Sequence, residues 1–369
     1  MQPETNLRIT LATGHTGSSA LAMDDGFRAI TAVQGLSFYL HAYPPDVVAF
    51  RAGELLSRLG SKLGLGLAEL QRRTKGMVIC VAGGAKRRDQ EQVRDFLDNI
   101  HWKSAPSHVT VVDDTWSGLV AGTTSYFGTC AFAGTGASVF VGLGKCPLTD
   151  HRGKFDGWGS IIGDFGSAFQ LSVDLFRSLN RHYDKTGKAP PLFKKILEAC
   201  PDIESIQNVQ RWFDAVFISE PHEWRLRLAT LARVVTAEAD RPKPKADGDA
   251  VRLINSAARQ MAKTLEIAIL RNPRARRYPV VFQGGMFEHS QRYRAVVLKR
   301  CRRLTSGGFA LAKYRPIIGA TLMFPDMRPE HAARFFRSIS LLPDSEIPIL
   351  VRNNHEAGIL RPKRAFCYG

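Results

Sequence analysis

The sequence predicts an α/β protein of two domains, and three observations support this class. Leucines recur at helical spacing from Pro45 to Arg73, as one helix or as two that break near Gly64. An apolar strand from Met77 to Ala82 and a helix through Phe96 come next, an order that implies crossover connections in a parallel sheet. With 369 residues, 44% of them hydrophobic, the chain can bury two ordinary cores.

A hairpin is predicted ahead of these elements. Its strands run from Leu7 to Ala12 and from Ala20 to Met23, and the turn between them is rich in glycine and hydroxyl side chains. This turn is either an ordinary polar connection or a loop that faces phosphate oxygens. In the second interpretation the phosphate contacts come from Gly14, Thr16, Gly17 and Ser18.

Another apolar strand, from Val109 to Val112, ends in two adjacent aspartates, Asp113 and Asp114. Carboxylates at the C-terminal end of a parallel strand lie where open α/β sheets bind ligands. Neighbouring side chains on a strand point in opposite directions, so at most one of the two faces a given cleft. The alternative role is to cap the next helix, and Asp113 is the candidate for it.

The middle of the sequence carries the most chemistry. Two short strands are joined by Gly134, Thr135 and Gly136, a tight turn whose backbone N–H groups and threonine hydroxyl can hold phosphate oxygens. Trp158 then stands between two glycines, and apolar residues recur at helical spacing after it, which places Asp164 at a helix N-terminus. A carboxylate that backbone donors orient in this way can bind hydroxyls.

Two later segments contain further glycine turns. A strand from Pro279 to Phe282 runs into Gly284 and Gly285 and then into a helix, an order typical of turns that approach adenosine or phosphate. The segment from Arg315 to Leu322 is expected to lead into a helix, with Gly319 permitting close packing against a neighbour.

Composition narrows the function classes. The net charge is +17, from 51 Lys and Arg against 34 Asp and Glu. The basic residues are spread over several segments without helix-turn-helix or zinc-finger spacing, so an enzyme that handles nucleotides is favoured over the alternative, a nucleic-acid-binding module. The six cysteines include no C-x-x-C, which argues against a zinc ribbon or a disulfide scaffold. No leader or membrane segment is recognised, so we expect a cytoplasmic protein without a membrane partner.

Taken together, the segments resemble the N-acetylglucosamine kinase and BadF/BadG/BcrA/BcrD-type ATPase family, within the actin, hexokinase and Hsp70-like superfamily. The resemblance extends from Leu7 to Phe324 and rests on four motifs in the family's order. These are GTG at Gly134–Gly136, GWGSIIGDFGSAF at Gly157–Phe169, VFQGGMF at Val281–Phe287 and PIIGATL at Pro316–Leu322.

The resemblance implies an ATP-dependent kinase that phosphorylates a hydroxyl of a hexosamine-like sugar or a related polyol. It implies two ribonuclease-H-like domains, residues 1–117 and 118–369, around a central cleft that binds ATP, Mg²⁺ and the sugar. The metal ligands stay unassigned, and a homodimer is an open alternative. By motif match, Asp114 resembles the aspartate that takes the proton from the acceptor hydroxyl. The other matches are Thr135 and Gly136 to phosphate, Gly284 and Gly285 to adenosine, and Trp158, Gly159 and Asp164 to the sugar.

Two departures from the family pattern support a second interpretation. The family's first phosphate loop begins with an acid, and Thr13 occupies that position here. Ser138 stands where N-acetylglucosamine kinases have an asparagine, which leaves the acceptor undetermined. The cysteines of the iron–sulfur branch are absent, so a redox ATPase is disfavoured. The alternative to an active kinase is a diverged, catalytically weak protein of the same fold that binds sugar or nucleotide as a sensor or partner.

Overall fold

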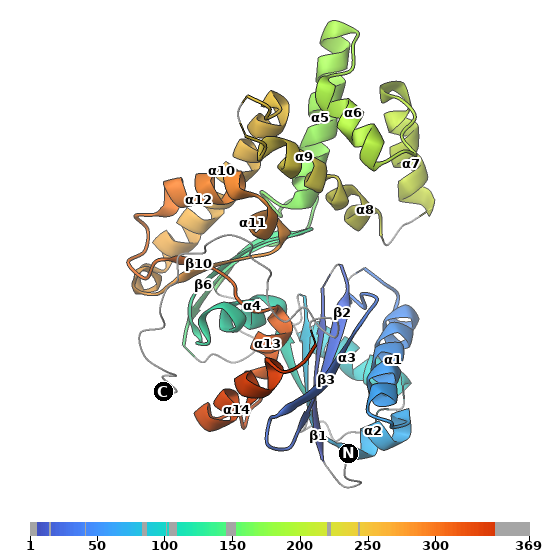
Figure 1. Ribbon diagram of the computed structural model, residues 1–369, viewed down its shortest axis with the longest axis vertical. Coiled ribbons are helices and arrows are strands. Elements are labelled where there is room, and N and C mark those ends of the chain that lie inside the picture. Colours follow the sequence, from blue (N-terminus) through green and yellow to red (C-terminus); the bar gives the residue numbers. More distant parts are fainter. Residues whose placement is uncertain are drawn as a thin grey trace. The chain divides into compact units, whose positions relative to one another are not determined.

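The computed structural model describes residues 6–14, 16–40, 42–82, 87–100, 102, 109–144, 153–219, 223–242 and 244–343. The chain divides into two compact units (Figure 1). Unit 1 comprises the described residues of Met1–Gly128, Gly142–Gly153 and Ala312–Gly369, and unit 2 those of Thr129–Val141 and Lys154–Leu311. This division differs from a single boundary after residue 117, because the chain returns to unit 1 with its last described helices.

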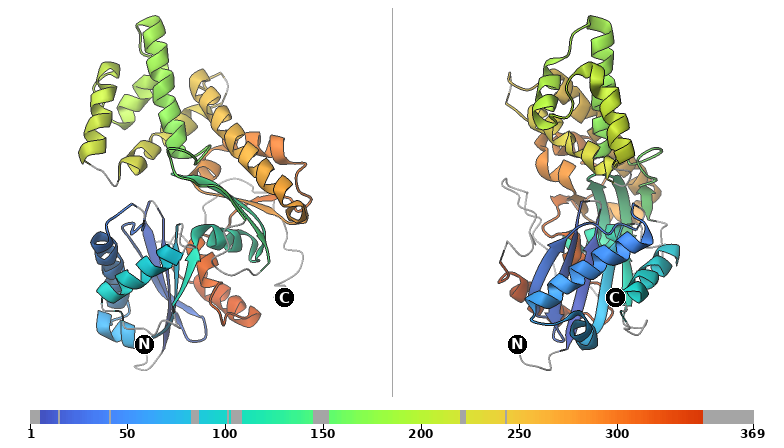
Figure 2. Two further views of the ribbon diagram at one scale, coloured as in Figure 1. Left: turned by 180° about the vertical axis from the view of Figure 1, so that it is seen from behind. Right: turned by 90° about the vertical axis from the view of Figure 1, so that its right-hand side faces the viewer.

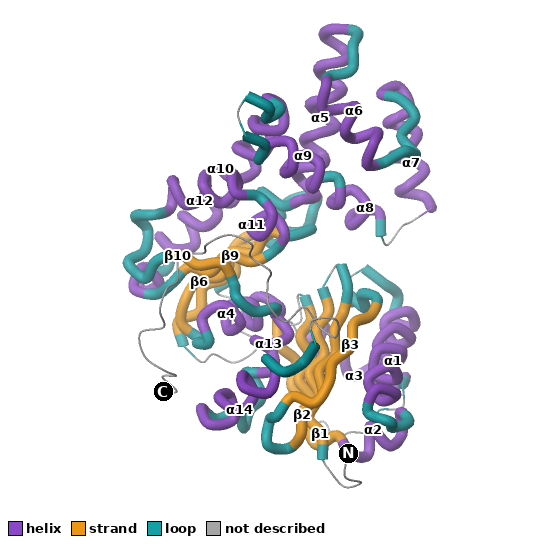
Figure 3. The backbone as a smooth tube through the Cα atoms, in the orientation of Figure 1, coloured by secondary structure: helices purple, strands orange, loops and turns teal. Residues whose placement is uncertain are grey.

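Unit 1 is built on a five-stranded sheet with the spatial order β3-β2-β1-β4-β5. Figure 3 shows the strands of this sheet in orange. The strands are β1 (Leu7–Thr13), β2 (Ser18–Asp24), β3 (Ala29–Gly35), β4 (Thr74–Val81) and β5 (Val109–Asp113). β1, β2 and β3 are antiparallel neighbours, whereas β4 and β5 run parallel to β1. The predicted hairpin and the predicted parallel strands are therefore confirmed, and β3 is an additional strand.

Helices cover both faces of this sheet (Figures 1 and 2). They are α1 (Pro45–Lys62), α2 (Leu67–Arg73), α3 (Arg87–Asn99), α4 (Asp114–Thr123), α13 (Pro316–Thr321) and α14 (Pro329–Ile339). Ile9 and Leu11 of β1 pack in the apolar cluster that α1 and α3 complete. Thr10 points to the other face, where it accepts a hydrogen bond of 2.9 Å from the Thr321 hydroxyl of α13. This alternation fixes which face each helix covers.

The two helices α4 and α13 pack against each other at unusually short range. A Cβ atom added at Gly319 of α13 would lie 1.8 Å from the carbonyl oxygen of Ser117 in α4. Only glycine permits this approach, as the sequence indicated. The helix that begins with Asp114 is thus held directly by α13, which lies about 200 residues later in the sequence.

Unit 2 contains a second five-stranded sheet, with the order β10-β9-β6-β7-β8. Its strands are β6 (Phe127–Ala133), β7 (Ala137–Leu143), β8 (Lys154–Asp156), β9 (Val280–Gln283) and β10 (Phe309–Leu311). β9 is parallel to both β6 and β10, and β8 is antiparallel to β7. The α/β class with two such sheets is therefore confirmed.

The helices of unit 2 share one large apolar core with its sheet. They are α5 (Ala168–Thr186), α6 (Pro191–Ala199), α7 (Val209–Ser219), α8 (Trp224–Thr230), α9 (Ala232–Ala239), α10 (Gly248–Arg271), α11 (Gly285–His289) and α12 (Gln291–Cys301). None of the helices in the described residues is long and apolar enough to span a membrane. The four described cysteines, Cys80, Cys130, Cys200 and Cys301, are buried free thiols. His15 of the first turn, Cys146 and Cys367 lie outside the described residues.

Candidate functional site

Polar residues line up across the strand ends of unit 1. Thr13 at the end of β1 is in register with Ser18 on one side and with Val81 on the other, and Val81 is in register with Asp113. Neighbouring strands lie about 4.8 Å apart, so the row places Thr13 and Asp113 roughly 10 Å apart. The structure therefore brings the first turn and the β5 aspartates to one edge of the sheet.

The first turn is tied to the residues that follow β3. The Thr13 hydroxyl accepts a 3.1 Å hydrogen bond from the Phe38 N–H, and the Ser18 hydroxyl donates to the Leu36 carbonyl at 2.6 Å. Within the turn, the Gly14 N–H donates to the Gly17 carbonyl at 3.0 Å. Both hydroxyls thus hold the fold. Among the described residues of this turn, the exposed Thr16 side chain remains for a phosphate.

The two aspartates after β5 have different environments. Asp113 is the N-cap of α4, and its carboxylate accepts hydrogen bonds from the Thr115 N–H, at 2.8 Å, and from the Thr115 hydroxyl. Its exposed fraction is only 2%. Asp114 is the first residue of α4 and is half-buried. Capping explains Asp113, as the sequence suggested, and it makes Asp114 the more accessible carboxylate.

The thiol of Cys80 lies beside this aspartate pair and is not a nucleophile. Burial raises its pKa, and the negative charges of Asp114 and Asp113 raise it further. The thiol is 3.0 Å from the Ser117 hydroxyl of α4. It therefore stays protonated and contributes to packing.

In unit 2 the Gly134-Thr135-Gly136 turn rests on the start of α5. The Gly134 N–H donates to the Gly136 carbonyl at 2.9 Å, which closes the turn. The Ala168 N–H, at the first position of α5, donates to the Gly134 carbonyl at 2.8 Å. These bonds hold the turn in one conformation while its backbone lies beside a helix N-terminus, where partial positive charge favours anions.

The carboxylate of Asp164 lies against this turn. A Cβ atom added at Gly136 would be 3.1 Å from Asp164 Oδ2, and the carboxylate accepts a hydrogen bond from the Ala137 N–H. Arg225 of α8 forms an ion pair with it, with Nη2 and Oδ2 3.3 Å apart. Asp164 itself is only 5% exposed. The sequence-predicted sugar and phosphate residues of unit 2 are thus direct neighbours.

Burial is the main influence on the pKa of Asp164 and raises it. The Ala137 hydrogen bond and then Arg225 oppose that rise, Asp156 adds to it, and Lys154 lowers the pKa again. The two donors that the fold supplies, the Ala137 N–H and Arg225, therefore limit the rise in the pKa that burial causes.

Asp156 organises the loop that leads to Asp164. Its carboxylate accepts hydrogen bonds of 2.8 Å from the backbone N–H groups of Gly157, Asp164 and Phe165. Asp156 and Asp164 both have left-handed backbone conformations, with φ of 60° and 58°. Two such residues in one short loop are uncommon, and they occur where a fold stores strain to aim particular groups.

The same loop presents apolar side chains to solvent. Trp158 is 75% exposed, and Ile161, Ile162 and Phe165 are exposed as well. The Gly163 N–H closes the loop onto the Gly159 carbonyl at 2.8 Å. An exposed indole on a braced loop offers an aromatic face on which a sugar ring can stack.

The second glycine turn touches the first. Gly284 has a φ of 96°, and a Cβ atom there would be 2.5 Å from the Ala133 carbonyl oxygen and 3.1 Å from the Gly134 nitrogen. Gly285 follows as the first residue of α11. Both turns therefore meet at the ends of β6 and β9, and the glycine at position 284 is a steric requirement.

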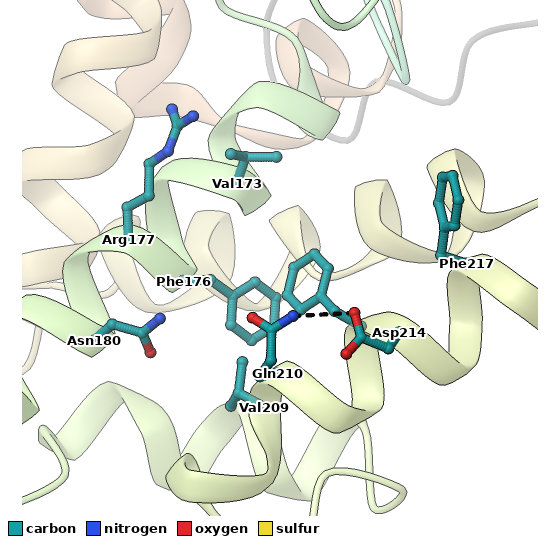
Figure 4. A pocket seen from close by; sticks show the side chains of 9 residues that line it. Val173, Phe176, Arg177, Asn180, Val209, Gln210, Asp214 and Phe217 are labelled. Atoms are coloured by element: carbon teal, nitrogen blue, oxygen red, sulfur yellow. Dashed lines mark hydrogen bonds between the residues drawn. The ribbon is translucent and has the colours of Figure 1, made fainter.

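A hollow of about 470 Å³ lies elsewhere in unit 2, between α5 and α7 (Figure 4). Its floor is aromatic, and Gln210 donates to Asp214 at 3.0 Å across one side. It contains none of the residues that the sequence selected. The lining residues are Val173, Phe176, Arg177, Asn180, Val209, Gln210, Phe213, Asp214 and Phe217.

Two residues of this site escaped the sequence analysis. Asp156 stands before Gly157, and Asp-Gly is a turn signal that could have been followed. Arg225 lies 61 positions after its partner Asp164 on a separate helix, so no local pattern connects them.

Known proteins with similar sequences are sugar kinases. No family model matches the sequence. Over 219 residues, 58% of this chain and 64% of the relative, the sequence is 26% identical to an N-acetylmuramic acid/N-acetylglucosamine kinase of Clostridium acetobutylicum. Over 123 residues, 32% of this chain and 37% of the relative, it is 26% identical to an N-acetyl-D-glucosamine kinase of Dictyostelium discoideum. These matches confirm the resemblance to N-acetylglucosamine kinases. The matched region spans less than two thirds of the length of each relative.

The structure is also similar to a solved structure from Chromobacterium violaceum that is assigned as an N-acetylglucosamine kinase. The TM-score is 0.64 at 16% identity, over 87% of this chain and 100% of that one. The chain thus has the two-domain fold of the actin-like ATPases.

Proposed function

We propose that the chain is an ATP-dependent sugar kinase that transfers the γ-phosphoryl group to a hydroxyl of a hexosamine-like sugar or a related polyol. The observation that carries this proposal is the contact between Asp164 and Gly136. It sets a hydroxyl-binding carboxylate beside a turn suited to phosphate, as a phosphoryl transfer between ATP and a sugar requires. Both curated relatives are named as N-acetylglucosamine kinases, in agreement with this class.

Each unit supplies part of the proposed chemistry. In unit 2 the N–H groups of Thr135 and Gly136 and the Thr135 hydroxyl bind phosphate oxygens, while the Gly134 N–H closes the turn. Gly284 and Gly285 admit the adenosine. Trp158, Gly159 and Asp164 bind the acceptor. In unit 1 Asp114 accepts the proton of the attacking hydroxyl, and the oxygen of that hydroxyl forms the new bond to the γ-phosphorus. The bond between the γ-phosphorus and the bridging oxygen of ATP breaks, and ADP leaves with its electrons.

Mg²⁺ fits the carboxylates that unit 1 provides. Within the described residues no group of three or more His, Cys, Asp or Glu side chains is placed to hold a metal. Mg²⁺ usually keeps several waters and needs only one or two carboxylates besides the substrate phosphates. Asp114 can serve as such a carboxylate, whereas Asp113 is buried and caps α4. The ion would neutralise charge on the phosphates of ATP.

The test is ADP release with Mg²⁺–ATP and a panel of amino sugars, neutral sugars and cyclitols. Asp114→Asn should lower kcat roughly 100- to 10,000-fold, the range for loss of a positioned base. Asp113→Asn is the matched control, because asparagine also caps helices well and should keep most of the activity. Turnover that survives Asp114→Asn and is abolished by Asp113→Asn would reject the assignment of the base.

A second function is favoured by one observation, the use of Thr13. Its hydroxyl accepts the Phe38 N–H, so the position occupied by an acid in the family is committed to the fold here. A diverged sensor or partner protein would bind nucleotide or sugar without turnover. Calorimetric titration of ATP with and without Mg²⁺ separates the cases. Binding without ADP release from any acceptor supports the sensor, and no binding in either condition overturns the kinase.

A further inference from the structure

The positive charge of the chain is concentrated in one short part of unit 2. Between residues 271 and 308 the sequence contains ten Lys and Arg residues and one acid, Glu288. Their net charge of +9 is more than half of the +17 carried by all 369 residues. The other 41 Lys and Arg residues are spread over the rest of the chain, as expected, but acids offset most of their charge. The excess in this segment calls for an explanation that nucleotide binding does not give.

The fold gathers these residues at one end of unit 2. α10 and α12 pack side by side (Figure 1). The residues after α12 fold back onto those after α10, where the Ser306 N–H and the Thr305 hydroxyl donate to the Arg276 carbonyl at 2.8 and 3.0 Å. We call the eight exposed cations of this region the basic surface. They are Arg271, Arg274, Arg276, Arg277, Lys299, Arg300, Arg302 and Arg303.

The fold uses the charges of this surface only in part: Arg271 lies 5.9 Å from the centre of the Phe155 ring, and Lys299 and Arg300 stand in the last turn of α12, where cations are favoured. The two other cations of the segment, Arg292 and Arg294, are half-buried and donate to main-chain carbonyls. By contrast, across the part of the chain that the structure describes, none of the eight side chains of the basic surface forms an ion pair with a carboxylate. Glu266 of α10 is an acid near the edge of the basic surface. It lies close enough to Cys301 to raise the pKa of that thiol, which Arg300 lowers. Eight like charges on one surface without carboxylate partners repel one another, which costs folding energy.

We propose that the basic surface binds the phosphate backbone of double-stranded nucleic acid. Seven of its eight cations are arginines, whose planar guanidinium groups bind phosphate oxygens in pairs. No large apolar side chain is exposed between residues 271 and 308 in the described chain, so single strands would find no aromatic face for stacking.

A lipid surface fits the basic surface less well. Binding in a membrane interface combines cations with apolar side chains that insert between the lipids. The exposed apolar residues closest in sequence are Ile267 and Leu270 of α10, at 43% and 49% exposure, and they precede the basic surface. A duplex presents one phosphate charge per roughly 1.7 Å of its axis, a density that matches a compact group of cations. The inference does not depend on the proposed kinase activity.

The test measures fluorescence anisotropy of a labelled random-sequence DNA duplex of about 20 base pairs, titrated with the full-length chain at several salt concentrations. The test variant replaces Arg276, Arg277, Arg302 and Arg303 together with glutamine. The matched control replaces Arg181, Lys185, Lys188 and Lys194 with glutamine, which removes the same charge. These four side chains are exposed on α5, the turn after it and α6 of the same unit.

The wild-type chain should bind the duplex with an affinity that falls steeply between about 50 and 200 mM salt. The test variant should bind on the order of 100-fold more weakly at 0.1 M salt. The slope of its salt dependence should be smaller by about 3.6, because each of the four lost phosphate contacts contributes about 0.9. The control should bind like wild type. Thermal melting of both variants checks that they are folded, and ADP release by the test variant should be unchanged.

Three results would overturn the proposal. The first is an absence of duplex binding by the wild-type chain at 50 mM salt. The second is an equal loss in the control variant, which would mean that diffuse charge is responsible. The third is that the test variant loses binding to phosphatidylserine vesicles while duplex binding is unaffected, because a lipid surface would then be the partner.

Discussion

Substituting Gly319 by alanine tests the packing of α13 against α4, the helix that begins with Asp114. The new Cβ would start 1.8 Å from the Ser117 carbonyl oxygen, whereas ordinary contact begins at 3.4 Å, so α13 and α4 must separate by about 1.6 Å. The backbone nitrogen of Ala121 would lie 2.7 Å from the same Cβ, so a sideways shift of α13 does not relieve the clash. Overpacking of this kind typically costs about 1–3 kcal/mol. A displacement near 1 Å at a reacting group can lower the rate about 100-fold.

Two measurements separate the structural effect from the catalytic one. Thermal melting of Gly319→Ala should show the loss of stability whether or not the chain is a kinase, and ADP release should fall about 100-fold if Asp114 is the base. Gly248→Ala is the matched control, because a Cβ at that first position of α10 has no atom within 4 Å. Alanine there should stabilise the chain by about 0.4–1 kcal/mol. Wild-type melting of Gly319→Ala would refute the packing of α4 on α13.

Three further predictions concern unit 2. Gly284→Ala should lower the melting temperature and raise the KM for ATP, because its φ of 96° and the nearby strand exclude a side chain, while Gly285→Ala should be nearly neutral in melting experiments. Asp156→Ala removes the acceptor of three backbone N–H groups and should raise the acceptor KM at least about 10-fold without changing the KM for ATP; equal changes in both would contradict it. Arg225→Gln removes a charge that lowers the pKa of Asp164, so the loss of acceptor binding on acidification should begin at a higher pH than in wild type, and Arg225→Lys should restore part of the difference; an unshifted pH profile would exclude this role.

The titration of Asp164 should also make the stability of the wild-type chain depend on pH. Burial raises the pKa of Asp164 in the folded state, so the folded chain binds this proton more tightly than the unfolded chain. The stabilising contribution is complete below the unfolded pKa of about 3.9 and is lost as the pH rises through the folded value. The melting temperature of Asp164→Asn relative to wild type should therefore increase over this interval.

Local patterns predicted most of the elements around the site. The hairpin of β1 and β2, the parallel strands β4 and β5, and the turn at Gly134 to Gly136 all follow from short apolar runs bounded by glycines or aspartates. The spacing around Gly319 also indicated close packing before any partner was known. In these cases the physical cause lies within a few residues of the signal.

What the sequence could not give depends on contacts between distant segments. Arg225 reaches Asp164 across 61 residues, and the return of α13 and α14 to unit 1 joins residues about 300 positions apart, such as Thr10 and Thr321. A charge count along the chain likewise misses that residues after α10 and after α12 share one surface. These arrangements are products of packing, and no periodicity records them.

The residue at position 13 determines which side chains of unit 1 can supply negative charge to a bound metal ion. Thr13 is in register with Ser18 and Val81, and its hydroxyl accepts the Phe38 N–H, so the hairpin turn is held by neutral groups. An acid is therefore not required there for folding, and the turn contributes no charge for a metal. Under the proposed function, the carboxylates near the phosphates in unit 1 are then those after β5. Binding of Mg²⁺–ATP should consequently depend on Asp114 much more than on any residue of the first turn.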